Sequence, residues 1–215
     1  MSIPMNAKWV CLTCIMLLSS SAALADDERT SNEISISGIT QFTRPAPGIA
    51  NFGTTPAIQS SKVSFGGSVE YRRWYGNNGF EATYSAVASN AHFVMPSLWF
   101  QMSLTRHEGA LSYVRRFFPH SKLNPLVSLG AGGFVTHGGF GFVNNGIWTP
   151  QGWLGVDGQF ELRLATGFDV LRTRHFGVRT GYVVHWFRAP NFSDSSYHGA
   201  RTFITEPQIG FLWKF

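Results

Sequence analysis

The chain has 215 residues and a formal net charge of +5, and only 13% of its residues are charged, about half the share that is typical of soluble domains. Its two cysteines, Cys11 and Cys14, both lie near the N-terminus, which excludes a disulfide framework or a thiolate nucleophile in the rest of the chain. The arginines are scattered and form no basic stripe, so nucleic acid is not an expected partner.

Residues 1–25 are typical of a secretory signal peptide. Lys8 supplies the positive charge, residues 9–18 form a short apolar core, and residues 23–25 offer a small-x-small cleavage site. The apolar core is too short to cross a bilayer as a helix. We therefore expect residues 1–25 to be removed on export, and residues 26–215 to form one mature domain.

Eight segments of the remaining chain alternate apolar and polar residues, the pattern of a β-strand with one face in an apolar medium. In the second segment, for example, Val63, Phe65 and Val69 alternate with serine, glycine and glutamate. The alternation changes parity near residues 106–109, which predicts a β-bulge in the fourth segment. In chain order the predicted strands are residues 33–43, 62–72, 79–89, 98–118, 123–137, 159–170, 176–186 and 205–215.

The connections between these strands alternate in length. Tight turns are predicted at residues 76–79, 119–122 and 172–175, and longer loops at residues 44–61, 92–97, 138–158 and 188–199. This alternation predicts an all-β fold, an eight-stranded antiparallel up-and-down transmembrane β-barrel with short periplasmic turns and longer external loops. An even number of strands places both ends of the barrel in the periplasm.

Polar residues on one face of the strands are expected to point into the barrel lumen. An eight-stranded barrel is just wide enough to be filled by side chains, and buried charges need partners, so we expect ion pairs and a filled interior. His185 and several serines and threonines share this face. The predicted lumen network consists of Glu70, Arg72, Glu81, Glu161, Arg163, Asp169, Arg179 and Lys214.

Aromatic residues gather near the predicted strand ends, as in the interfacial belts of membrane barrels. Trp74, Tyr75 and Phe117 are expected at the periplasmic rim, and Trp153 and Trp186 near the outer rim. Such belts favour a barrel whose apolar face contacts lipid.

The last strand ends on an aromatic residue. Its large apolar residues, Ile209, Phe211, Trp213 and Phe215, occupy alternate positions. This segment resembles the C-terminal sorting strand of bacterial outer-membrane barrels, which implies that these four residues act as the insertion signal. Together with the GGSVEYRRWYGNNGFEATYS hairpin and the PLVSLGAGGFVTH strand, it resembles the OmpA-like and opacity-porin-like eight-stranded outer-membrane families.

The resemblance implies an integral protein of the bacterial outer membrane with a structural or surface-interaction, adhesion-like role carried by external loops. Its implied partners are outer-membrane lipid and lipopolysaccharide, the barrel-assembly machinery and periplasmic chaperones, while the ligand of the loops stays open. No catalytic residue and no cofactor is expected. No metal site is expected either, because the histidines are isolated and lack a short ligand spacing.

Three alternatives remain open. A lumen lined by charges could form a small passive channel. A lipid A-modifying enzyme would need a base beside a nucleophile, and His92, His137 and His198 lie near external loops, the last close to Ser195 and Ser196. No histidine–serine strand motif accompanies them, so an enzyme is the least favoured. A soluble lipocalin-like barrel with an apolar ligand would reverse the two faces of every strand.

Overall fold

The computed structural model describes residues 30–43, 50–52, 55–60, 63–95, 98–119, 121–144, 147–188 and 201–215. The predicted signal peptide lies outside the described residues. Within those ranges, no helix has the length and apolar character needed to cross a membrane. The strands are β1 (Ser31–Thr43), β2 (Ala50–Phe52), β3 (Thr55–Ser60), β4 (Val63–Tyr75), β5 (Asn78–Met95), β6 (Leu98–Arg116), β7 (Leu123–Asn144), β8 (Ile147–Leu171), β9 (Phe176–Arg188) and β10 (Arg201–Lys214).

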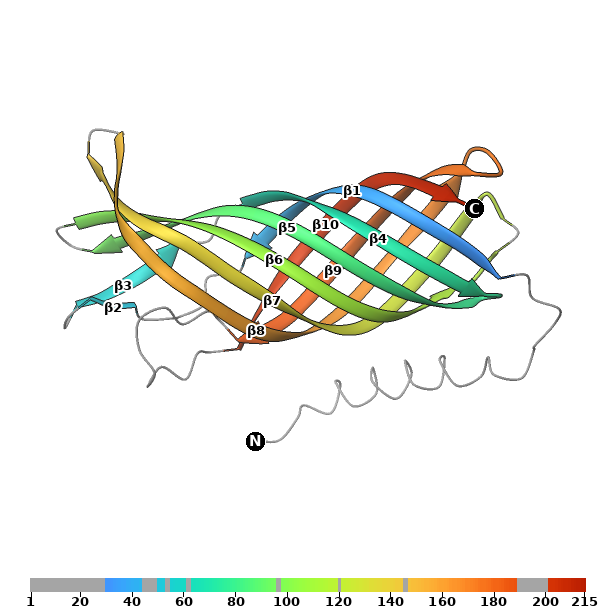
Figure 1. The fold of residues 1–215 in the computed structure, drawn as a ribbon, viewed down its shortest axis with the longest axis horizontal. Coiled ribbons are helices and arrows are strands. Elements are labelled where there is room, and N and C mark those ends of the chain that lie inside the picture. Colours follow the sequence, from blue (N-terminus) through green and yellow to red (C-terminus); the bar gives the residue numbers. More distant parts are fainter. Residues whose placement is uncertain are drawn as a thin grey trace.

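Eight of these strands close into a barrel. Each pairs antiparallel with two neighbours in the order β1, β4, β5, β6, β7, β8, β9, β10 and back to β1. Ile36 faces Phe211 on one side and Val69 on the other, which places β1 between β10 and β4. The predicted eight-stranded antiparallel barrel is confirmed, and Figure 1 shows its strands tilted against the long axis. The short strands β2 and β3 pair with each other, and β3 also pairs with β5.

Tight turns join the strands at one end of the barrel, called the turn end. Tyr75 pairs with Asn78 across a two-residue turn in which Gly76 has a φ of 62°. Glycine adopts this left-handed conformation without the steric cost of a Cβ atom. The amide of Asn32 donates to the carbonyl of Phe215 at the same end, so the barrel begins and ends there (Figure 1). The opposite end is called the hairpin end.

The two faces of the strands differ sharply in chemistry. On the outer wall, Phe211 is 80% exposed and Leu111 is 72% exposed, whereas the inward-facing Glu70 is fully buried. Along β4 the exposed and buried positions alternate almost without interruption, as the period of two requires. An apolar exterior around a polar interior is the arrangement of a membrane barrel. The soluble lipocalin-like alternative is therefore wrong, because it needs the reverse.

The strands continue further towards the hairpin end than the sequence analysis predicts. β7 and β8 stay paired as far as Asn144 and Ile147, so the predicted loop at residues 138–158 is wrong. The glycine clusters of this segment do not end the pairing. Instead, the ladder absorbs them in two register shifts, the first between Gly138 and Gly139, which act as β-bulges. The predicted loop at residues 92–97 likewise shrinks, because β5 and β6 remain paired to their adjoining ends.

The predicted bulge at residues 106–109 is also wrong. β6 pairs in continuous register with β5 through this segment, from Arg106 opposite Val87 to Gly109 opposite Tyr84. The apolar alternation fades there for a different reason. His107 and Gly109 occupy the outer face, so the wall loses its large apolar side chains without any change of register.

The predicted position of Trp74 is wrong as well. The aromatic-belt prediction places it on the outer wall, but the side chain points into the barrel and is only 1% exposed. The guanidinium of Arg116 lies 4.5 Å from the centre of its ring, a cation–π contact. Its neighbour Tyr75 faces outward and is 42% exposed, as a belt residue should be.

Candidate functional site

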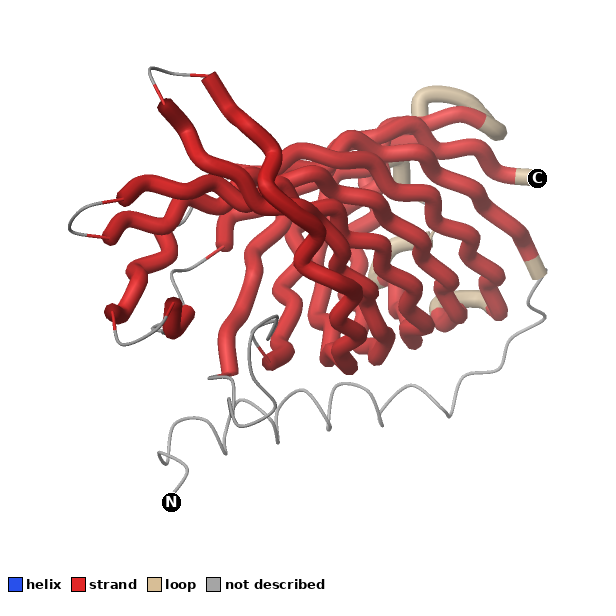
Figure 2. The backbone as a smooth tube through the Cα atoms, turned by 60° about the vertical axis from the view of Figure 1, so that its left-hand side comes forward, coloured by secondary structure: helices blue, strands red, loops and turns tan. Residues whose placement is uncertain are grey.

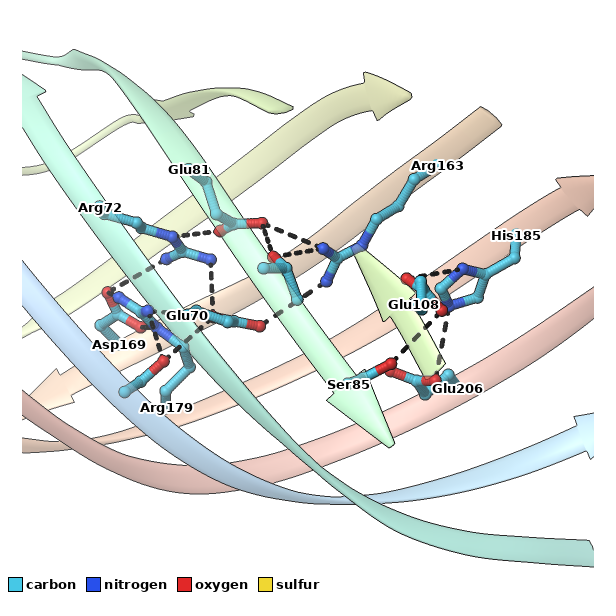
Figure 3. Close-up of polar contacts among 12 residues, drawn as sticks. Glu70, Arg72, Glu81, Ser85, Glu108, Arg163, Asp169, Arg179, His185 and Glu206 are labelled. Atoms are coloured by element: carbon cyan, nitrogen blue, oxygen red, sulfur yellow. Dashed lines mark hydrogen bonds and ion pairs between the residues drawn. The ribbon is translucent and has the colours of Figure 1, made fainter. Parts of the chain in front are cut away.

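Buried charged groups fill the middle of the lumen (Figure 3). They come from β1, β4, β5, β6, β8, β9 and β10, and they meet because alternate residues of every strand point inward. We call the first group, nearer the turn end, the ionic layer. It consists of Glu33, Glu70, Arg72, Glu81, Arg163, Asp169 and Arg179.

Arg179 is the centre of the ionic layer. Its Nε donates to Oδ1 of Asp169 at 2.7 Å and its Nη2 to Oδ2 at 2.9 Å, a bidentate pair. The same guanidinium donates to Glu70 and to Glu33, each at 3.1 Å, and to the hydroxyl of Ser35. Because Arg179 is only 1% exposed, these contacts replace the water that the charge has lost.

Arg72 and Arg163 complete the ionic layer. Arg72 donates to Glu81 through Nε and to Glu70 through Nη2, the latter at 3.4 Å. Arg163 lies 3.5 Å from Glu81 and 3.7 Å from Glu70. Glu70 therefore contacts all three arginines of the layer. The layer holds four carboxylates and three guanidinium groups, so acidic groups are in excess by one.

A second polar group, which we call the histidine layer, lies nearer the hairpin end. Nδ1 of His185 is 3.2 Å from Oε2 of Glu161 and 3.5 Å from Oε1 of Glu108, while Nε2 is 3.5 Å from Oε2 of Glu206. Arg106 lies 3.3 Å from Glu108. Figure 3 shows this group beside the ionic layer, separated from the Arg179 end of that layer. Glu108, Glu161 and His185 each offer one atom suited to a metal ion, all within 4.8 Å of one another.

Apolar clusters cover both polar layers. Phe134, Phe187 and Ile204 pack together on the side of the hairpin end, with the rings of Phe134 and Phe187 in an edge contact at 4.8 Å. At the turn end Trp74 packs with Val114 and Leu126. Along β9 the inward order is Arg179, His185, Phe187, so the layers follow one another along the barrel axis. These apolar clusters exclude water, and in the absence of water the charged groups between them interact more strongly with one another.

The structure brings together most of the predicted lumen residues but not all. Glu161 belongs to the histidine layer and not to the ionic layer. Lys214 is half-buried at the turn end and takes no part in the ion pairs found among the described residues. The other predicted members form the ionic layer, namely Glu70, Arg72, Glu81, Arg163, Asp169 and Arg179.

Sequence reasoning missed five buried charged residues, Glu33, Arg106, Glu108, Arg116 and Glu206. Arg106 and Glu108 were hidden by the false change of parity in β6. Glu206 could have been found, because it shares its face with Gln208 and Lys214 in the last strand.

The predicted insertion-signal residues all face outward. Ile209 is 63% exposed, Phe211 80%, Trp213 50% and Phe215 52%. The rings of Trp213 and Phe215 lie 5.2 Å apart at the turn end. Their role in insertion stays a prediction.

A small polar cluster also lies on the outer wall, across β5, β6 and β7. The hydroxyl of Tyr84 is 2.8 Å from Nδ1 of His107, and the ring of His107 stacks on that of His137 at 5.3 Å. His137 is one of the histidines considered for the lipid-modifying alternative. The other candidates of that alternative, the side chain of His92 and residues 194–198, lie outside the described residues.

No protein-family model matches the chain, and no curated protein sequence matches it. Several solved structures are similar. Neisserial surface protein A superposes with a TM-score of 0.60 at 13% identity, over 87% of this chain and 100% of that one. A major outer membrane protein from Thermus thermophilus gives 0.54 at 10% identity, over 84% and 99%. Ail, the attachment invasion locus protein of Yersinia pestis, gives 0.51 at 12% identity, over 87% and 99%.

The chain has the fold of the bacterial outer-membrane β-barrels. This matches the architecture that the sequence resemblance implies. Identities of 10–13% establish the fold alone, so the residues of the two polar layers have to be interpreted from their own chemistry.

Proposed function

We propose that the chain is an integral, non-enzymatic protein of the bacterial outer membrane that acts at the cell surface through its hairpin end. The observation that carries the proposal is a filled, layered lumen inside an apolar outer wall. Such a barrel serves as a rigid support for whatever projects from it. A purely structural role in the membrane is the simpler version of the same proposal.

The filled lumen argues against conduction. Glu70, Arg179 and His185 lie in the middle of the barrel and are each no more than 1% exposed, and apolar clusters cover them on both sides. A passive channel needs a continuous wet path, whereas these side chains occupy the cross-section of a barrel that is narrow to begin with.

The hairpin end offers a surface for recognition. β8 pairs with β9 only from Glu161 towards the turn end, while from Ile147 to Gln159 its partner is β7. The β7–β8 hairpin therefore projects beyond β9, and Figures 1 and 2 show it standing clear of the barrel. Binding residues are often carried by such projections on a rigid scaffold. Ail is described by its name as an attachment protein, which is consistent with this use of the fold.

The outer wall and the last strand suggest the partners. An apolar wall that includes Leu111 and Phe211 suits the acyl chains of outer-membrane lipid and lipopolysaccharide. The alternating aromatic residues of β10 suit recognition by the barrel-assembly machinery, and periplasmic chaperones would hold the chain before insertion. The ligand of the hairpin end is not specified by these features.

The first experiment is fractionation combined with heat-modifiability. We expect the expressed protein in the outer membrane, migrating differently in detergent gels before and after boiling, because a closed barrel resists unfolding by detergent. Recovery as a soluble periplasmic protein would contradict the proposal. Planar-bilayer recordings on the same preparation test the channel alternative, and resolved conductance steps would favour a pore over a filled barrel.

The surface role is tested by shortening the β7–β8 hairpin. A variant in which residues 139–156 are replaced by a two-residue turn keeps every β8–β9 pair and removes four β6–β7 pairs, from Phe100–Phe142 to Ser103–Gly139. We expect it to keep the boiling-dependent shift while expressing cells lose adhesion to a surface coated with serum proteins. Unchanged adhesion would contradict the surface role and leave only the structural role. An altered lipid A mass spectrum on expression would instead favour the lipid A-modifying enzyme.

A further inference from the structure

The histidine layer gathers metal-ligand atoms from strands that are distant in sequence. Glu108 lies on β6, Glu161 on β8 and His185 on β9. One donor atom of each lies within 4.8 Å of the other two, and the three side chains are at most 2% exposed. The set combines one imidazole nitrogen with two carboxylate oxygens, which is a common ligand class for first-row transition metals.

The spacing of these donors fits one bound ion. Nδ1 of His185 is 3.2 Å from Oε2 of Glu161 and 3.5 Å from Oε1 of Glu108. In a four-coordinate zinc site, bonds of about 2.0–2.2 Å place neighbouring ligand atoms about 3.3–3.6 Å apart. Small side-chain adjustments would thus suffice to bring all three atoms to bonding distance of a common centre.

Two carboxylate oxygens of the histidine layer are available to bind a cation. Oε2 of Glu108 is engaged by Arg106 at 3.3 Å and by Ser85 at 3.4 Å, which leaves Oε1 on the side of His185. Oε1 of Glu161 is buried and has no hydrogen-bond partner among the described residues. A buried carboxylate oxygen without a partner is unusual in a folded protein and calls for an explanation.

The other nitrogen of His185 has the surroundings typical of a metal ligand. Nε2 lies 3.5 Å from Oε2 of Glu206, and Gln41 donates a hydrogen bond to the same carboxylate. Metal-bound histidines usually direct their second N–H to a carboxylate or a carbonyl, which fixes the ring and its tautomer. Glu206 and Gln41 would orient the ring in this way.

The net charge of the histidine layer also favours a bound cation. The layer holds three carboxylates, from Glu108, Glu161 and Glu206, and one guanidinium, from Arg106. A divalent cation would neutralise the group, with His185 neutral. A protonated His185 in its place would leave one negative charge in excess, which only a second proton, shared between the carboxylates of Glu108 and Glu161, would cancel.

We propose that Glu108, Glu161 and His185 bind a divalent first-row transition-metal ion, of which zinc is the natural probe, inside the barrel lumen. An imidazole ligand favours such an ion over magnesium or calcium. The site is structural, because apolar clusters close the lumen on both sides of it. It is independent of the surface role, which can fail or hold without affecting it.

The closed lumen makes a specific prediction about exchange. The ion would enter as the barrel forms and would then be trapped. Protein folded into detergent in the presence of zinc and then desalted should retain about one zinc per chain. EDTA should remove little of that zinc from the unboiled, folded form and all of it after boiling. Folding with Co²⁺ instead should give the visible absorption bands of four-coordinate cobalt.

Matched variants assign the ligands. We expect Glu161→Gln and His185→Gln to abolish retention of zinc, and Glu206→Gln to weaken it by about 10–100-fold, as is typical for a residue that orients a ligand. Glu33→Gln makes the same change in the ionic layer and should retain zinc. A double variant of the outer-wall histidines, His107→Gln with His137→Gln, should retain it too.

Three results would overturn the proposal. The first is folded wild-type protein without zinc after folding in its presence, which would mean that a proton on His185 serves in place of the ion. The second is full retention of zinc in folded Glu161→Gln. The third is loss of zinc in the outer-wall double variant. If Glu161→Gln does not fold, X-ray absorption of the zinc-loaded wild type decides, since a shell without an imidazole ligand would contradict the assignment.

Discussion

Arg179 offers the sharpest test of the ionic layer. Replacing it with glutamine removes a guanidinium that contacts Asp169, Glu70 and Glu33. Four carboxylates then face two guanidinium groups in a part of the barrel that water does not reach. Removing one partner of a buried ion pair costs about 3–5 kcal/mol, because the other charge is left uncompensated. We expect Arg179→Gln to destabilise the barrel by about that much.

The reasoning makes a stronger prediction about a second change. Asp169→Asn added to Arg179→Gln removes the carboxylate that has lost its bidentate pair with Arg179. Three carboxylates then remain with two guanidinium groups. The excess of acid then returns to the value of the wild type. The double variant should therefore be more stable than Arg179→Gln alone, by about 0.5–3 kcal/mol, which is the range of coupling seen between residues in contact.

Urea unfolding of the protein in lipid vesicles measures both effects. The folded fraction follows from the boiling-dependent gel shift, and tryptophan fluorescence provides a second probe. Lys214→Gln is the control, because Lys214 also faces inward but takes no part in the described ion pairs, and it should change stability by no more than about 0.5 kcal/mol. A double variant as unstable as Arg179→Gln, or less stable, would refute the charge-balance argument.

Three further predictions use the same unfolding assay. Trp74→Ala should cost about 3–5 kcal/mol, since Trp74 is 1% exposed and packs with Val114, Leu126 and Arg116, whereas the neighbouring outward Tyr75→Ala should cost clearly less. Leu111→Arg should cost about 2–4 kcal/mol if its 72% exposed side chain faces the middle of the bilayer, and a cost near zero would place it outside the lipid. Gly130→Ala should cost about 1–3 kcal/mol, because the new Cβ would lie 2.4 Å from the carbonyl oxygen of Leu111, while Gly109→Ala meets open space and should be neutral.

Alternation along the strands and the alternating lengths of the connections predicted the barrel, and the aromatic belts and the last strand indicated that its apolar face is the outer one. The strand ends were not predictable in the same way. Turn residues such as Gly76 mark the turn end clearly, and the observed turn lies where the sequence predicts it. At the hairpin end the strands leave the apolar surrounding, so β7 and β8 lose the alternation and keep the pairing.

The membership of the polar layers could be predicted only in part. Parity along a strand says that Arg179 and Glu70 face inward, but their contact joins residues 109 positions apart across the lumen. It depends on the tilt and stagger of the whole barrel, which no single strand encodes. The histidine layer is the extreme case, because Glu108, Glu161 and His185 have no informative spacing in the sequence.

The layered order of the lumen links these results. The two polar layers adjoin each other between the apolar clusters, so their charged groups have one another, and not water, as partners. In the ionic layer, Glu70 contacts three arginines, which compensate its charge. The histidine layer has a single guanidinium, from Arg106, for its three carboxylates, so its negative charge is compensated less completely. Water is excluded from both layers. This exclusion makes the loss of Arg179 costly in stability, and it also favours a bound cation beside the carboxylates of the histidine layer.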